Sequence, residues 1–430
     1  MNPPSPFPPI GYCTNVHAGT TLHSIKTNLL AHAKRVRELV HEDGIEPLPV
    51  GLWLANDAAV GMSSAEIHEF RDLLDGHRLK PYTFNGFPFA DFHQDVVKHE
   101  VYEPTWASLQ RSQYTQQLAT ILDGLLPTGE VGTISTLPIG WPTGPKDRGQ
   151  SDLSKRFCSD DLVTLEQASN LLASNARQLV QMEAETGRLI RICIEPEPGC
   201  LLDCADDIRQ FFEQSLLPAS TAHQVTASQI RRHITVCHDV CHSAVMFEPQ
   251  ANAIAAYLEA GIQVGKVQVS SAVEARLGGA NSNLVLEQLA TFNEPKYLHQ
   301  TSVQTSSMIG AEDSVDGRVL QGCQFFEDLP DALAGSEQRS LANDETWRVH
   351  FHVPIFMERL GELHTTQFEI VNCFRVLQES GCFAKNAIPP HVEVETYAWN
   401  VLPKAHAESS LADGIAKEIH WLVKLLQADL

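Results

Sequence analysis

The sequence predicts an α/β fold, a (β/α)8 TIM barrel in which eight parallel strands alternate with helices. Two observations predict it. Strand-like runs take turns with amphipathic helical stretches along the chain, and acidic or histidine side chains directly follow several of these runs. Barrels of this kind with insertions reach 430 residues as one unit, so residues 1–430 are expected to form a single domain.

The predicted strands are short apolar runs bounded by turn residues. They cover residues 11–15, 50–54, 81–84, 131–136, 189–195, 234–239, 264–269 and 392–396. Helical stretches with spaced apolar residues lie between them, at 25–40, 64–74, 114–125, 162–185 and 251–260. A last helix, at 411–426, closes the chain. Strict alternation of the two kinds of element favours a closed barrel over an open sheet.

The alternation is interrupted between the seventh and eighth strands. Residues 271–390 are too many for a single crossover and contain two more strand-like pieces, 297–303 and 348–355. Loops that follow barrel strands emerge at the catalytic rim. We therefore expect residues 275–345 to form an insertion in the seventh βα loop that lies over this rim as a lid. The alternative is that residues 348–355 are themselves a barrel strand and one of the eight is assigned wrongly.

Composition and charge exclude several classes of protein. The formal net charge of −22 would repel a phosphate backbone, so nucleic acid is not an expected partner. The proline-rich residues 1–9 lack the pattern of a signal peptide, and no run of about 18 apolar residues occurs. We expect a cytoplasmic protein without stable membrane insertion that binds a small molecule. The sequence leaves open whether the protein forms a homo-oligomer.

The ten cysteines are scattered, which is typical of reduced thiols in a reducing compartment. A four-thiolate metal site remains as an alternative, built from Cys200, Cys204, Cys237 and Cys241.

Polar side chains stand where predicted strands stop. Glu195 ends the fifth strand, Asp239 ends the sixth and precedes His242, and Glu395 lies at the end of the eighth. Strands fix such side chains while loops leave room for a substrate, so this placement predicts a metal or acid/base site at the barrel mouth. The alternative for Asp239 is a purely structural role as the cap of the next helix.

These residues resemble the xylose isomerase-like TIM barrels, which include sugar phosphate isomerases, epimerases and repair enzymes of the endonuclease IV type. Longer strings occur along the chain, namely YCTNVH at 12–17, EPEP at 195–198, VGKVQVS at 264–270, YLHQ at 297–300 and HFHVP at 350–354. These strings resemble more specifically the metabolite traffic protein EboE family, which is encoded in bacterial secondary-metabolite clusters.

The resemblance implies a metal and two catalytic carboxylates. The epimerase ligand set is matched here by Glu195, Asp239, Gln268 and Glu395. In those enzymes the two glutamates exchange protons with the carbon beside a carbonyl, while the metal stabilises the enediolate. His242 matches a histidine that contacts substrate or, in the nucleases, a further metal. The family has a histidine where this chain has Gln268, so either His350 or His352 completes the coordination or the metal is held loosely.

Physical chemistry supports the same reaction type. Removing a proton beside a carbonyl generates an oxyanion, which a bound cation stabilises by several kcal/mol. A set rich in carboxylates suits Mn2+, Mg2+, Co2+ or Zn2+, and the sequence does not choose among them.

Further candidates for substrate binding are His17, Trp53, Lys266, His350 and His352. Lys266 shares the inward face of its strand with Gln268, where it either binds an anionic substrate or pairs with a carboxylate. His17 and Trp53 have structural roles as their alternatives.

The sequence thus predicts a metal-dependent isomerase or epimerase that acts on a sugar-like or polyol metabolite. Two alternatives remain: a noncatalytic metabolite-binding or traffic protein, supported by Gln268, and a metal-dependent phosphoesterase.

Overall fold

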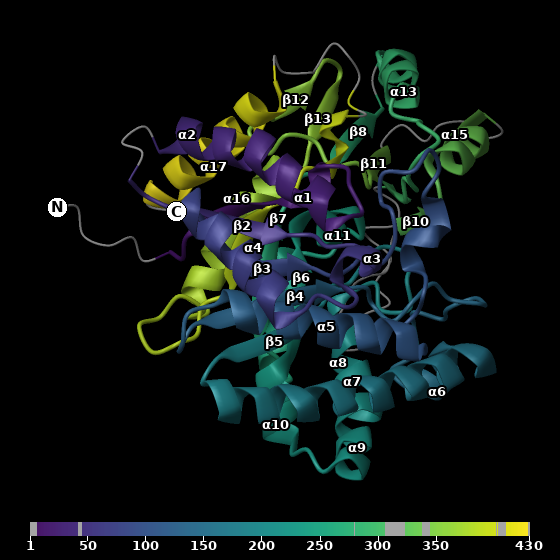
Figure 1. Ribbon diagram of the computed structural model, residues 1–430. Helices are drawn as coiled ribbons and strands as arrows, with labels where there is room; N and C mark the ends of the chain where they lie inside the picture. The colour runs from purple at the N-terminus through teal and green to yellow at the C-terminus, as the bar shows by residue number, and fades with distance from the viewer. Residues whose placement is uncertain are drawn as a thin grey trace.

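Eight parallel strands close into a barrel, in the order β1-β14-β7-β6-β5-β4-β3-β2 (Figure 1). The computed structural model describes residues 7–41, 45–278, 280–305, 323–337, 345–400, 402 and 410–428. The strands are β1 Ile10–Cys13, β2 Leu48–Leu52, β3 Leu79–Asn85, β4 Val131–Thr136, β5 Leu189–Ile194, β6 Ile234–Asp239, β7 Val264–Val269 and β14 His391–Val394. Each predicted strand is a barrel strand, so the predicted fold class is confirmed.

Helices surround the barrel and bury their apolar faces against it. They are α1 Leu22–Asn28, α2 Lys34–Val40, α3 Asn56–Ala59, α4 Ser64–Gly76, α5 Leu109–Leu125, α6 Leu153–Arg156, α7 Ser159–Thr186, α8 Ala205–Phe211, α9 Leu217–Ser220, α10 Ala227–His233, α11 Val240–Val245, α12 Gln250–Glu259, α16 Gln367–Glu379 and α17 Leu411–Gln427. The last helix, α17, packs against α2 and β1 and so closes the ring (Figure 1). Across the described ranges, no helix is both long and apolar enough to cross a bilayer.

Local sequence signals set the ends of several helices. Ser63 and Glu66 form a capping box at the start of α4, where each side chain accepts a hydrogen bond from the other residue's backbone N–H. The long helix α7 ends at Gly187, whose φ of 71° is a left-handed conformation that glycine adopts without steric cost. Both helices overlap the predicted ranges 64–74 and 162–185 closely.

The interior of the barrel contains a buried ion pair. Lys266 Nζ on β7 lies 2.6 Å from Glu393 Oε2 on β14, and both side chains are fully buried. Gly51 on β2, which is separated from β14 by β1 alone, makes room for this carboxylate, because a Cβ there would lie 1.2 Å from Glu393 Oε1. The pair therefore lies inside the barrel rather than at its rim.

A second, six-stranded sheet is inserted between β7 and β14. Its strands run in the order β10-β9-β11-β8-β13-β12, and all neighbours that pair are antiparallel. They are β8 Val273–Leu277, β9 Thr301–Thr305, β10 Cys323–Phe326, β11 Glu345–Val349, β12 Arg359–Leu360 and β13 Leu363–Thr365. Helices α13 Ser282–Ala290 and α15 Leu329–Glu337 accompany them.

The position of β11 decides between the two alternatives for residues 348–355. β11 pairs with β8 and β9, so this segment is not a barrel strand. Of the expected insertion 275–345, residues 279, 306–322 and 338–344 lie outside the described residues, as do residues 1–6 at the start of the chain.

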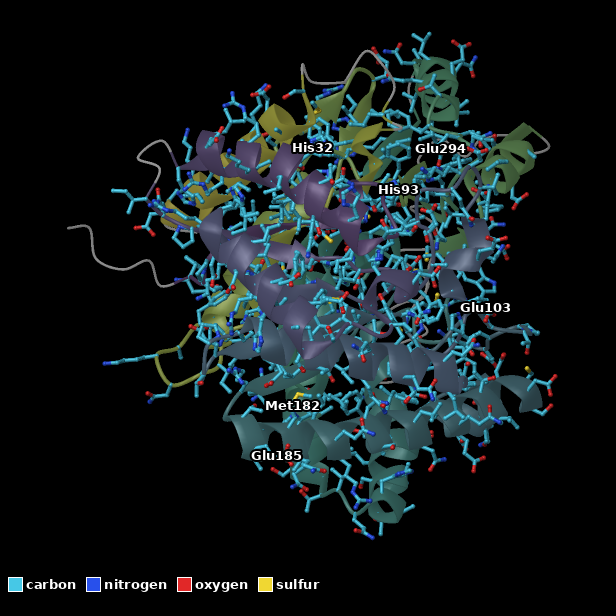
Figure 2. The ribbon with its side chains drawn as sticks, in the orientation of Figure 1. His32, His93, Glu103, Met182, Glu185 and Glu294 are labelled. Atoms are coloured by element: carbon cyan, nitrogen blue, oxygen red, sulfur yellow. The ribbon has the colours of Figure 1, made fainter. Side chains whose placement is uncertain are left out.

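The inserted segment meets the loop that follows β3 at the rim. The backbone N–H groups of Val97 and Lys98 donate to the carbonyl of Lys296, at 2.7 and 3.0 Å. The Lys98 ammonium pairs with Asp328, and Lys296 Nζ donates to the carbonyl of His93 at 3.2 Å. Figure 2 shows His93 beside the loop that carries Glu294. These contacts hold one edge of the insertion against the mouth of the barrel; its action as a lid stays a prediction.

Candidate functional site

Three carboxylates converge at the mouth of the barrel. Glu195 follows β5, Asp239 ends β6 and Glu395 follows β14, and each is at most 5% exposed. Each offers an oxygen, and the three oxygens lie within 4.8 Å of one another. This separation is compatible with one shared cation.

Hydrogen bonds orient two of these carboxylates and leave oxygens free. Glu395 Oε1 accepts from the amides of Asn15 and Asn85, both at 2.8 Å. Asp239 Oδ1 accepts from the backbone N–H of His242 at 3.0 Å and caps α11. Within the described part of the chain, Asp239 Oδ2 and Glu195 Oε2 have no hydrogen-bond partner. Asp239 is therefore a helix cap through one oxygen and can be a ligand through the other.

The cluster carries more negative charge than its surroundings neutralise. Burial and the neighbouring carboxylates of Glu395 and Asp239 raise the pKa of Glu195 well above its ordinary value. Burial and the charges of Asp239 and Glu393 raise the pKa of Glu395 in the same way. The ammonium of Lys266 acts on both, but it is already paired with Glu393. A bound cation would balance these charges.

Three histidines face the same region with their Nε2 atoms. Nδ1 of His242 lies 2.7 Å from the carbonyl of Pro196, and Nδ1 of His352 lies 2.8 Å from the carbonyl of Glu395. Carbonyl oxygens only accept, so both Nδ1 atoms carry a proton. His350 Nδ1 is held in the same way by Gln300 Oε1 at 2.8 Å.

Burial keeps two of these rings neutral. It lowers the pKa of His352 to about 4 and that of His350 well below its ordinary value. Asp239, His242 and His352 form a second group whose ligand atoms lie within 4.8 Å of one another. His352, on the segment that follows β11, therefore lies close enough to Asp239 and His242 to share a cation with them, and its role as the missing ligand stays a prediction.

A cavity opens above these groups. Its lining includes the site carboxylates Glu195 and Glu395, Glu197 and the three histidines. Five aromatic residues also line it, namely Phe87, Phe92, Tyr102, Tyr297 and Tyr397. Asp239 and Gln268 do not line this cavity, although the oxygen that Asp239 contributes lies within 4.8 Å of those of Glu195 and Glu395. A lining that mixes polar and aromatic side chains suits a small metabolite that has both polar and apolar parts.

Three of the residues predicted to bind substrate do not line this cavity. Lys266 lies inside the barrel and pairs with Glu393, which is the alternative that the sequence left open. His17 and Trp53 line a separate small cavity, where His17 stacks on His32 at 4.6 Å and the Trp53 indole donates to the carbonyl of Pro88 at 3.2 Å.

Gln268 is buried beside Glu393, and neither its Oε1 nor its Nε2 has a hydrogen-bond partner that meets normal geometry. The four-thiolate alternative is wrong, because no metal-sized cluster within the described ranges contains two of Cys200, Cys204, Cys237 and Cys241.

Sequence reasoning missed several residues of the site. Asn85 ends β3 and holds Glu395, and its place at a strand end was the available signal. Tyr102 donates to Glu197 at 2.5 Å, and Gln300 donates to the same oxygen at 3.1 Å. Both reach the site from loops or the insertion, where no periodic pattern marks them.

Comparisons with known proteins give fold-level likeness. A xylose isomerase-like TIM barrel protein from Mycobacterium smegmatis in complex with magnesium matches with 10% identity over 98% of this chain and 97% of that one, at a TM-score of 0.46. A xylose isomerase domain protein from Planctomyces limnophilus matches with 14% identity over 97% and 96%, at 0.43. D-psicose 3-epimerase with D-tagatose from Clostridium cellulolyticum H10 matches with 14% identity over 61% and 73%, at 0.37.

No protein-family model and no curated protein matches the sequence. The chain is therefore assigned to the closed (β/α)8 barrels from its own strand order and register.

Proposed function

We propose that the protein is a metal-dependent isomerase or epimerase that moves a proton beside the carbonyl of a sugar-like or polyol metabolite. The observation that carries the proposal is the set of three buried carboxylate oxygens within 4.8 Å. At an effective dielectric constant of 20, two unit charges at that distance repel by about 3 kcal/mol, so the cluster favours a divalent cation.

The donor set fits such an ion. Glu195, Asp239 and Glu395 would hold it, with Gln268 or a histidine as the fourth ligand. When bound, the ion supplies positive charge beside the substrate oxygen. The set of carboxylates suits Mn2+, Mg2+, Co2+ or Zn2+.

The two glutamates suit proton transfer from opposite sides. Glu195 and Glu395 follow strands that lie across the barrel mouth from each other, and both line the cavity. Asn15 and Asn85 fix the position of Glu395, whereas Glu195 Oε2 is free to accept a proton. A substrate carbon between them would lose a proton to one carboxylate and gain one from the other.

The aromatic residues that line the cavity support a small metabolite as the partner, in agreement with the net charge of −22. We further propose that the protein acts in secondary-metabolite biosynthesis or traffic. This proposal rests on the resemblance of the sequence strings to the EboE family.

Metal analysis and hydrogen exchange test the proposal together. Purified protein loaded with Mn2+ or Mg2+ is dialysed and its metal is quantified; it is then incubated with ketoses, sugar phosphates and cyclic keto-polyols in D2O. We expect Glu195→Gln and Glu395→Gln to lower retained metal and to abolish deuterium incorporation beside the carbonyl. The exposed Glu259→Gln on α12 is the matched control and should leave both unchanged.

The same assay separates the alternatives. Bound metal with no deuterium exchange on any substrate would favour the noncatalytic binder. Cleavage of abasic DNA would favour the phosphoesterase. Retention of metal by Glu395→Gln at the wild-type level would show that the carboxylate cluster is not the metal site.

A further inference from the structure

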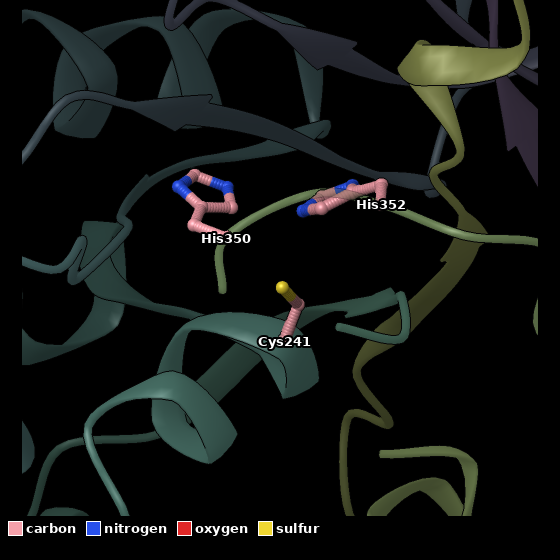
Figure 3. A group of neighbouring side chains, drawn as sticks. All are labelled: Cys241, His350 and His352. Atoms are coloured by element: carbon pink, nitrogen blue, oxygen red, sulfur yellow. The ribbon is translucent and has the colours of Figure 1, made fainter. Parts of the chain in front are cut away.

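A further group of possible metal ligands, different from that of Asp239, His242 and His352, lies beside the carboxylates. Cys241 on α11 and the two histidines that follow β11, His350 and His352, each offer one ligand atom, and these atoms lie within 4.8 Å of one another. Figure 3 shows the Cys241 sulfur pointing toward the space between the two imidazole rings. All three side chains are buried, with exposures of 0%, 6% and 1%.

A hydrogen-bonded chain sets the lone pair of His350. The Gln300 amide Nε2 donates to the carbonyl of Pro198 at 3.2 Å and to the carboxylate of Glu197 at 3.1 Å, both of which only accept. Its Oε1 must therefore face His350 Nδ1, which donates to it at 2.8 Å. His350 Nε2 is left with an outward lone pair.

The carbonyl of Glu395 fixes His352 in the same tautomer. Among the residues that the structure describes, Nε2 of His350 and Nε2 of His352 have no hydrogen-bond partner. Leaving a buried acceptor unpaired costs about 1–3 kcal/mol, and here two such acceptors lie beside one thiol. Fixing the Nδ1 proton by a carbonyl is how metal-binding histidines are commonly oriented. Both observations indicate a ligand between the rings.

The donor types distinguish this group from the carboxylates. One sulfur and two imidazole nitrogens favour Zn2+ or another soft ion, whereas the carboxylate group consists of oxygens alone. Tetrahedral zinc with ordinary bond lengths places such donors about 3.3–3.6 Å apart. Ligand atoms within 4.8 Å reach this spacing by small side-chain rotations.

We propose that Cys241, His350 and His352 bind a zinc ion that is separate from the ion of the carboxylate cluster. The zinc would join α11 of the barrel to the segment that leaves the inserted sheet. Three protein ligands leave a fourth position, and since His350 and His352 line the cavity, this position is open to water or to a ligand atom there. His352 then serves the zinc, which leaves His242, Gln268 or water for the first ion.

Cobalt substitution tests the thiolate directly. Metal-free, reduced protein is titrated with Co2+, and the sulfur-to-cobalt charge-transfer absorption is recorded. We expect the band in the wild type and its loss in Cys241→Ser. Cys373→Ser, which replaces another buried free thiol, is the control and should keep the band. Absence of the band from the wild type, or its persistence in Cys241→Ser, would overturn the proposal.

Zinc competition gives an independent measure. Cys241→Ser and His350→Gln should each weaken zinc binding at this site at least about 100-fold, since loss of an outer partner alone costs 10–100-fold. His350→Gln also serves if Cys241→Ser does not fold. Unchanged zinc affinity in His350→Gln would contradict the proposal. Glu395→Gln should keep the cobalt band while it loses the first ion, so failure of the proposed function and failure of this site are distinguishable.

Discussion

Removal of the buried ammonium of Lys266 gives the clearest prediction about stability. Lys266 Nζ lies 2.6 Å from Glu393 Oε2, and neither side chain reaches solvent. Two unit charges at that distance attract by about 6 kcal/mol at an effective dielectric constant of 20. In Lys266→Met the carboxylate loses this partner but retains the cost of burial.

The expected loss is limited because Glu393 can take up a proton. Its ordinary pKa is 4.5, so protonation at pH 7 costs about 3.4 kcal/mol, which is close to the 3–5 kcal/mol typical of a broken buried pair. We therefore expect Lys266→Met to lower the free energy of unfolding by about 3–4 kcal/mol at pH 7. The loss should shrink as the pH falls toward 4.5, since protonation then costs less.

Urea denaturation at pH 7 and pH 5 measures this effect. Lys80→Met is the matched control, because Lys80 forms a half-exposed pair with Glu130 at 3.4 Å on the same barrel and should cost less than about 1 kcal/mol. Adding Glu393→Gln to Lys266→Met should recover part of the loss. A change below 1 kcal/mol in Lys266→Met would refute the reasoning, and a raised KM at unchanged stability would favour a substrate-binding role.

Three further predictions concern charge and metal. Burial and the charges of Asp207 and Asp203 raise the pKa of Glu248 from 4.5 to about 8, so the folded protein binds a proton there that the unfolded chain releases. The stabilisation that this proton provides is fully present below pH 4.5 and is lost as the pH rises through 8. The neutral amide of Glu248→Gln needs no proton, so this variant should be more stable than the wild type by roughly 3–5 kcal/mol at pH 8 and equally stable below pH 4.5. Urea denaturation at the two pH values measures the difference. Chelation should lower the melting temperature, because an ion at 100 times its Kd stabilises by about 2.7 kcal/mol; an unchanged melting temperature after verified metal removal would contradict an ion in the carboxylate cluster. Gln268→His should tighten Mn2+ or Zn2+ retention if Gln268 is the fourth ligand, whereas unchanged retention in both Gln268→His and Gln268→Ala would assign that position to another group.

The barrel strands could be predicted because each carries its own local signal. Parallel strands buried on both faces are continuous apolar runs, and β5, β6 and β7 are buried at every position. Polar residues directly after such runs stand out, which is why Glu195, Asp239 and Glu395 were recognised as neighbours. Parallel strands bring their carboxyl ends to one rim, so the periodicity also predicts this gathering.

The place of Lys266 could not be predicted in the same way. The alternation of side chains along a strand indicates that Lys266 faces inward. How deep its side chain lies within the barrel depends on the register between neighbouring strands. His391 and Glu393 on β14 pair with Lys266 and Gln268 on β7, which sets the ammonium beside Glu393 below the mouth. The packing of helices beside β1 and β2 likewise directs His17 and Trp53 into their own small cavity.

The sequence by itself determined the closed barrel, the interruption after the seventh strand and the three carboxylates, because strand periodicity and strand-end polarity are local properties. Only the tertiary structure decided which distant residues complete the site. Gln300, His350 and His352 reach the mouth through antiparallel pairing of β11 with β8 and β9, and Cys241 meets the two histidines only through that pairing. Contacts between segments about a hundred residues apart depend on how the inserted sheet packs on the rim, which no local pattern specifies.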